Sequence, residues 1–113
     1  MKKITVAIAG LGVVGCETAR LLRARRGELS ERLGAELVLV AVADRQAGRE
    51  ARALGLPACV ARYADPVAMA RRADAALFVE LLGGYETPRR FVLEALGRGK
   101  PVVTANKRLL AYA

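Results

Sequence analysis

Residues 3–15 read KITVAIAGLGVVG, an apolar run that leads directly into a glycine-rich turn. The run through Ala9 is too short for a full helix and rich in β-branched residues, which is typical of a central parallel strand. The turn, residues 10–15, has the spacing GxGxxG and precedes a helical pattern. A strand, this turn and a helix in that order are the context that dinucleotide binding requires.

The glycines of this turn have separate physical tasks. Gly10 permits the tight turn, Gly12 lets a pyrophosphate approach the backbone, and Gly15 lets the helix pack closely on the strand. Val13 and Val14 begin the helix, whose free N–H groups would face the negative charge of the ligand. We therefore assign cofactor binding to these five residues. The alternative is a glycine-rich turn that binds nothing.

The composition indicates one globular domain. The chain has 113 residues, of which 54% are hydrophobic and 27% charged, unlike a disordered chain. No apolar run approaches a membrane span, and no signal peptide precedes the first strand. We therefore expect a cytoplasmic protein without a membrane partner.

The net charge of +8 raises the question of a nucleic-acid partner. Most of the basic residues are arginines spread along the chain, with no aromatic interleaving and no recognition motif, so we expect none. An anionic ligand or solvated helix faces explain the charge. Cys16 and Cys59 form no CxxC and have no histidine companions, so we expect small buried side chains and no metal site.

Apolar runs and helical patterns alternate along the chain. This alternation predicts an α/β fold, a Rossmann-like open parallel sheet flanked by helices that stops after its fifth strand. We expect the apolar face of the first helix to pack on the sheet with Gly15, Cys16, Ala19 and Leu22. The apolar face of the last helix consists of Phe91, Val92, Ala95 and Leu96. We expect helices at about residues 13–26 (stopped by Gly27), 29–33, 46–55, 66–73 (capped by Asp65) and 87–97 (capped by Thr87, with Gly99 beyond), and strands at 3–9, 37–43, 59–61, 75–81 and 102–103.

The second strand ends in Asp44-Arg45, where this fold reads the adenosine ribose. The distance from Gly15 exceeds the usual spacing of about 20 residues, and the polar segment 28–35 accounts for the excess. A carboxylate at Asp44 would bind ribose hydroxyls, as in NAD sites, whereas Arg45 would pair with a 2′-phosphate, as in NADP sites. We expect NADP to be preferred to NAD. For Asp44 an N-cap of the next helix is the alternative.

Three further segments lie where ligands bind in open sheets. Glu80 ends a strand and either faces the crevice or is a solvated strand end. Gly83 and the glycine after it either approach a cofactor or make a turn. Lys107 follows the strand that ends near Thr104, and a cation in a first helical turn opposes the helix dipole. An anion-binding or catalytic role of Lys107 and a solvated lysine are the two interpretations.

Residues 10–15, the long segment before the second strand, ELLGG at 80–84 and above all GKPVVTANK at 99–107 resemble the N-terminal nucleotide-binding part of homoserine dehydrogenase. The resemblance covers essentially all 113 residues. It implies NAD(P)-dependent interconversion of homoserine and aspartate semialdehyde, a step toward threonine and methionine. It also implies that a substrate domain absent from this chain binds homoserine, so we expect the chain alone to be inactive.

Residue by residue, the resemblance implies that the glycine turn holds the pyrophosphate and that Arg45 lies near the adenosine phosphate. Leu82 and Gly83 would pass along the cofactor, Thr104 would belong to its site, and Lys107 would match the lysine at the cofactor and catalytic centre. A homo-oligomer is expected through an exposed edge of the sheet. The alternative function is a non-catalytic nucleotide-binding or assembly module.

Overall fold

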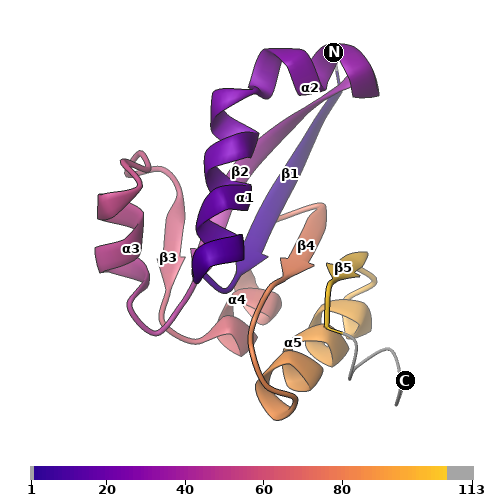
Figure 1. Ribbon diagram of the computed structural model, residues 1–113. Coiled ribbons are helices and arrows are strands. Elements are labelled where there is room, and N and C mark those ends of the chain that lie inside the picture. The colour runs from indigo at the N-terminus through magenta and orange to yellow at the C-terminus, as the bar shows by residue number, and fades with distance from the viewer. Residues whose placement is uncertain (1, 107–113) are drawn as a thin grey trace.

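The computed structural model describes residues 2–106, which form one parallel sheet flanked by helices (Figure 1). In order along the sheet, the described strands are β3 (Ala61–Tyr63), β2 (Ala35–Ala43), β1 (Lys2–Ala9), β4 (Leu77–Glu80) and β5 (Val102–Thr104). The helices are α1 (Val13–Ala24), α2 (Arg26–Leu33), α3 (Ala47–Ala53), α4 (Pro66–Arg72) and α5 (Glu86–Gly97). The predicted Rossmann-like fold class is confirmed.

The order of the strands reverses at β1. The chain first moves outward from β1 through β2 to β3, then crosses back and adds β4 on the other side of β1. Ligands of open α/β sheets bind at the carboxyl ends of the strands at such a reversal. The fold therefore directs attention to the loops that follow Ala9 and Glu80, which are neighbours in the sheet.

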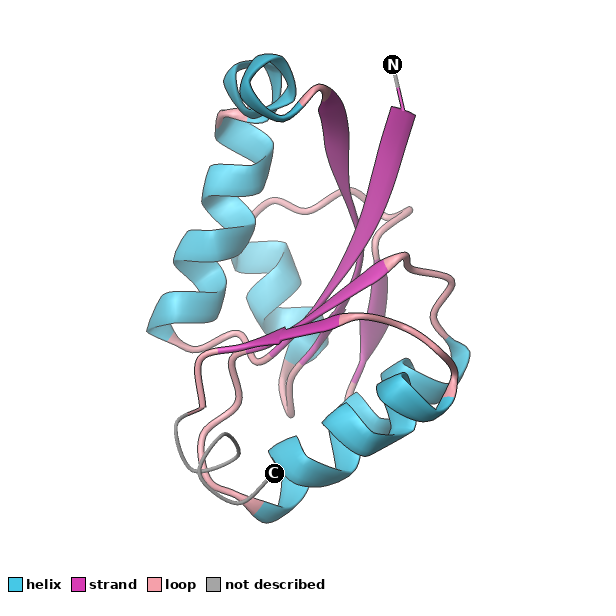
Figure 2. Cartoon of the chain, turned by 90° about the vertical axis from the view of Figure 1, so that its right-hand side faces the viewer, coloured by secondary structure: helices cyan, strands magenta, loops and turns pink. Residues whose placement is uncertain are grey.

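Apolar side chains cover the sheet on both faces, and Figure 2 shows α1 and α5 on opposite sides of it. On the face of α4 and α5, the rings of Phe78 and Phe91 meet edge to face with centroids 5.9 Å apart. On the face of α1, Ile8 and Val42 pack with Ala19. This double cover explains why the strands read as continuous apolar runs.

The first predicted helix, at 13–26, ends two residues earlier, at Ala24, and the helix expected at 29–33 begins three residues earlier, at Arg26. Arg25 leaves helical geometry, with φ −111° and ψ 26°, and α2 begins at the next residue and runs through Gly27. The expected stop at Gly27 is therefore wrong. The left-handed glycine is Gly34, with φ +68°, and it ends α2 immediately before β2. Arg25 and Arg26 favour a helix C-terminus at this point. The polar segment after them can also form helix, and it does so as α2.

Four smaller expectations also need correction. The third strand lies at Ala61–Tyr63 rather than at 59–61. Thr87 does not cap α5, because this helix begins one residue earlier at Glu86 and has no side-chain cap bond. Leu96 on α5 is 53% exposed rather than packed on the sheet. Cys59 is exposed and Cys16 is half-buried, so neither cysteine is a fully buried side chain.

Other local predictions are confirmed. The Asp65 carboxylate accepts the N–H of Val67 at 2.9 Å and caps α4, whose first residue is a proline. Gly99 is left-handed with φ +73°, and its N–H donates to the carbonyl of Leu96 at 2.9 Å. This is the usual way to close a helix C-terminus such as that of α5.

Candidate functional site

The loop between β1 and α1 is held between two neighbouring strands. The N–H of Gly10 donates to the carbonyl of Ala43 at the end of β2, at 2.8 Å. Gly10 has φ +100°, and a Cβ built on it would lie 2.6 Å from the carbonyl oxygen of Leu81. Both its conformation and its contact with the loop after β4 therefore require a glycine.

The other two glycines of the turn differ sharply from each other. A Cβ on Gly15 would lie 1.8 Å from the carbonyl oxygen of Gly10. The close approach of α1 to the turn is therefore possible only with a glycine at this position. Gly12 has an ordinary φ of −76°, and a Cβ on it would meet nothing within 4 Å. Gly15 is thus needed by the fold, whereas Gly12 leaves open space beside the backbone.

Asp44 connects this turn to the end of β2. Its Oδ1 accepts the N–H of Leu11 and its Oδ2 the N–H of Gln46, both at 3.1 Å. Gln46, and not Asp44, occupies the N-cap position of α3, so the expected helix cap is wrong. Cys16 adds a third restraint, because its thiol donates to the carbonyl of Leu11 at 3.2 Å. Burial, with a smaller contribution from the charge of Glu50, raises the pKa of the Cys16 thiol.

A crevice of about 430 Å³ opens over these strand ends. It contains six of the residues that the sequence assigned to cofactor binding, which come from the loops after β1, β2 and β4: Gly10, Gly12, Asp44, Arg45, Leu82 and Gly83. Four lining residues were not predicted: Ala64, Pro66, Leu81 and Thr87. Ala64 directly follows β3, so the rule that ligands bind at carboxyl ends of strands could have identified it.

The remaining predicted site residues lie outside the crevice wall. Val13 and Val14, at the start of α1, are 85% and 61% exposed, and Gly15 is buried below them. Thr104 is turned toward Glu80 and donates its hydroxyl to that carboxylate. Lys107 lies outside the described residues.

Glu80 is fully buried between β1 and β5. Its Oε2 accepts the N–H of Leu82 at 2.6 Å, and its Oε1 accepts the hydroxyl of Thr104 at 2.5 Å. The interpretation as a solvated strand end is therefore wrong. Both carboxylate oxygens are engaged by the protein, as a buried carboxylate requires.

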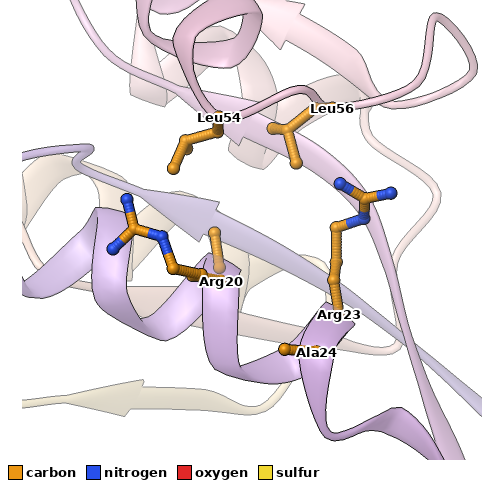
Figure 3. Close-up of a pocket in the computed structure, with 6 residues that line it drawn as sticks. Arg20, Arg23, Ala24, Leu54 and Leu56 are labelled. Carbon is orange, nitrogen blue, oxygen red and sulfur yellow. The ribbon is translucent and has the colours of Figure 1, made fainter.

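A second cavity of about 290 Å³ lies between α1 and the end of α3 (Figure 3). Leu54 and Leu56 line one side of it, and the guanidinium groups of Arg20 and Arg23 lie on the other. Arg20 pairs with Glu17 on the same helix, and Arg23 donates to a backbone carbonyl at 3.2 Å. Both arginines thus have partners within the chain, so this cavity presents fewer free hydrogen-bond donors to a ligand than its two guanidinium groups suggest.

Residues 2–106 contain no group of three potential ligand side chains that could hold a metal ion. No helix in this part of the chain combines the length and apolar character needed to span a membrane.

Comparison with known proteins agrees with the geometry of the crevice. The family described as "Homoserine dehydrogenase, NAD binding domain" matches residues 10–113. Homoserine dehydrogenase of Neisseria gonorrhoeae is 39% identical over 111 residues, which are 98% of this chain and 25% of that protein. The enzyme of Corynebacterium glutamicum is 41% identical over 110 residues, which are 96% of this chain and 24% of that protein.

A solved structure agrees with these relatives. The crystal structure of a homoserine dehydrogenase from Thiobacillus denitrificans superimposes with a TM-score of 0.84 at 38% identity, over 99% of this chain and 25% of that one. The chain thus spans about a quarter of the length of the relatives that it matches. It belongs to the family of homoserine dehydrogenase NAD-binding domains.

Proposed function

We propose that the crevice binds a nicotinamide dinucleotide, with NADP(H) preferred to NAD(H). The open space at Gly12 carries this proposal. It lies at the N-terminus of α1, where N–H groups without helical partners favour an anion, and a Cβ on Gly12 would meet no atom within 4 Å. The family of the chain supports the same class of ligand.

The preference for NADP(H) rests on Asp44 and Arg45. Both oxygens of Asp44 already accept backbone N–H groups, which leaves this carboxylate fewer free lone pairs for ribose hydroxyls. Arg45 is exposed at the crevice, and its guanidinium presents donors in a planar fork that suits a phosphate. We therefore assign Arg45 to the 2′-phosphate and Asp44 mainly to the shape of the turn.

We further propose that this crevice supplies the cofactor for the NAD(P)-dependent interconversion of homoserine and aspartate semialdehyde. The names of the relatives support the reaction. By resemblance, Lys107 acts at the cofactor and catalytic centre, and Lys107→Ala in a complete homoserine dehydrogenase should lower turnover strongly while the fold remains intact. Unchanged kinetics of this variant would assign Lys107 to the solvent instead.

Calorimetric titration of the chain with NADPH and NADH tests the cofactor proposal. We expect both to bind and NADPH to bind more tightly, by about 1 to 2 kcal/mol from a charge-assisted pairing with a phosphate. Tighter binding of NADH would overturn the preference. Binding of neither cofactor would instead favour the assembly module that retains the fold without a ligand.

A further inference from the structure

Glu80 and Gly10 meet the same peptide unit from two sides. The N–H of this unit, contributed by Leu82, donates to the Glu80 carboxylate at 2.6 Å. The carbonyl oxygen of this unit belongs to Leu81, and a Cβ built on Gly10 would lie only 2.6 Å from it. The orientation of the Leu81–Leu82 peptide is therefore fixed by Glu80, and the turn after β1 packs directly on that peptide.

A second set of contacts extends from Glu80 to the far end of the same loop. Thr104 donates its hydroxyl to Glu80 and accepts the N–H of Asn106 at 3.0 Å. The Asn106 side chain donates to the carbonyl of Gly84 at 2.8 Å. The segment from Leu82 to Gly84 is thus held at both ends by one network centred on a buried carboxylate.

This loop forms a wall of the crevice, since Leu81, Leu82 and Gly83 all line it. Glu80 itself does not line the crevice and is fully buried. Burying a carboxylate is costly unless it is hydrogen-bonded, and an apolar side chain would satisfy the same core position at lower cost. A role in the geometry of the neighbouring loop accounts for a carboxylate at this position.

We propose that Glu80 is a positioning residue, which holds the 81–84 loop at the distance from the glycine turn that a dinucleotide needs, with Thr104 and Asn106 completing the network. One carboxylate oxygen accepts the N–H of Leu82 and the other accepts the hydroxyl of Thr104, so the carboxylate serves both donors. The effect on ligand binding rests on the proposed function, whereas the effect on the loop does not.

Two variants test the network, and a third serves as a matched control. Glu80→Gln removes the charge and replaces one acceptor oxygen by an NH2 donor, and Thr104→Val removes the hydroxyl at nearly constant shape. Thr5→Val removes a hydroxyl that accepts the N–H of Ala76 at 2.9 Å, away from the crevice. The free energy of unfolding in urea, the Kd for NADPH and hydrogen exchange at the Leu82 amide are measured for each.

We expect Glu80→Gln and Thr104→Val to raise the Kd for NADPH by about tenfold, the scale on which supporting contacts influence a bound group. Exchange at the Leu82 amide should accelerate in both. Thr5→Val should retain the Kd and the slow exchange at Leu82, and it should lose less stability, because the N–H of Ala76 keeps the backbone carbonyl of Thr5 as a partner at 3.0 Å. A purely structural role would instead make the Kd follow stability in all three variants.

Unchanged exchange at Leu82 and unchanged affinity in Glu80→Gln and Thr104→Val would overturn the inference. An equal loss of affinity in Thr5→Val would overturn it as well. If the parent chain binds neither cofactor, the proposed function fails, and exchange at Leu82 alone decides the role of Glu80. If Glu80→Gln does not fold, Thr104→Val provides the same two measurements.

Discussion

The backbone N–H of Leu11 donates to the carboxylate of Asp44, a residue 33 positions later in the chain. This bond joins the turn after β1 to the end of β2, alongside the bond from Gly10 to Ala43. Dinucleotide sites usually direct the carboxylate at this position to the ribose. Here it also holds the turn that we propose as the pyrophosphate site. The parts of the crevice are therefore coupled before any ligand arrives.

Gly12→Ala should separate binding from folding. Its φ is ordinary and its added Cβ meets no protein atom, so stability should be retained or rise slightly. The same Cβ would occupy space proposed for the pyrophosphate, so we expect the Kd for NADPH to rise by about tenfold, or about 1.4 kcal/mol. Titration and urea unfolding measure the two effects.

Gly15→Ala is the matched contrast to Gly12→Ala. Its Cβ would lie 1.8 Å from the carbonyl oxygen of Gly10, so α1 must move. We expect a loss of about 1 to 3 kcal/mol in the free energy of unfolding, as for other overpacked positions. Equal stability of the two variants, or normal affinity in Gly12→Ala, would contradict the separate tasks of these glycines.

Arg45→Gln should remove the preference for NADP(H). We expect the Kd for NADPH to rise until it is close to the Kd for NADH, because Arg45 pairs with the 2′-phosphate that only NADPH carries. The Kd for NADH should change little. Arg49→Gln on the exposed surface of α3 makes the same change in charge and does not line the crevice. Equal effects of the two variants would show that overall charge, rather than Arg45, attracts the cofactor.

The two thiols should differ in reactivity. Cys59 is exposed, whereas Cys16 is half-buried, donates to the Leu11 carbonyl and has a raised pKa. A raised pKa means a smaller thiolate fraction at a given pH, so Cys16 should react more slowly with a thiol reagent at pH 8. Single-thiol variants Cys16→Ala and Cys59→Ala measure the two rates separately, and a faster reaction at Cys16 would refute the burial argument.

Arg98 should stabilise the end of α4. Its guanidinium donates to the carbonyls of Ala70 and Ala73, the latter at 3.2 Å, near the end of a helix whose last carbonyls lack helical partners. We expect Arg98→Met to reduce the free energy of unfolding by about 1.5 kcal/mol, the scale of a hydrogen bond to a charged group. Arg90→Met, an exposed change on α5, should have little effect in the same urea titration.

Local patterns in the sequence predicted most of the fold, because each buried strand is a continuous apolar run and each turn carries its own signal. Residues 3–15 predicted the central strand, the turn and the start of α1 correctly. The end of the first helix was predicted to within two residues. The start of α2 directly at Arg26 was not, because Gly27 favours a stop and only the packing of α2 on β2 continues the helix through it. Cys59 and Leu96 were misassigned because a favourable residue type does not determine which side of a loop or helix faces solvent.

The crevice was predicted as far as it depends on strand ends and glycine spacing. Five of its lining residues follow from those two signals, whereas Leu82 was assigned from the resemblance to the family. The position of Asp44 at the crevice was predicted, but its bond to the N–H of Leu11 was not, because Leu11 is remote in sequence. The network of Glu80 and Thr104 was not visible at all, because it requires that β4 and β5 be adjacent and in register, which no local pattern encodes.

The position of β1 between β2 and β4 also sets the order in which the protein can assemble. As the chain emerges from the ribosome, β1 and β2 can pair once Ala43 has been made, but the second edge of β1 waits for Glu80. Parallel pairings across such separations are slow compared with local ones. Capture of a dinucleotide would therefore follow the docking of β4 on β1 rather than the initial collapse of the chain.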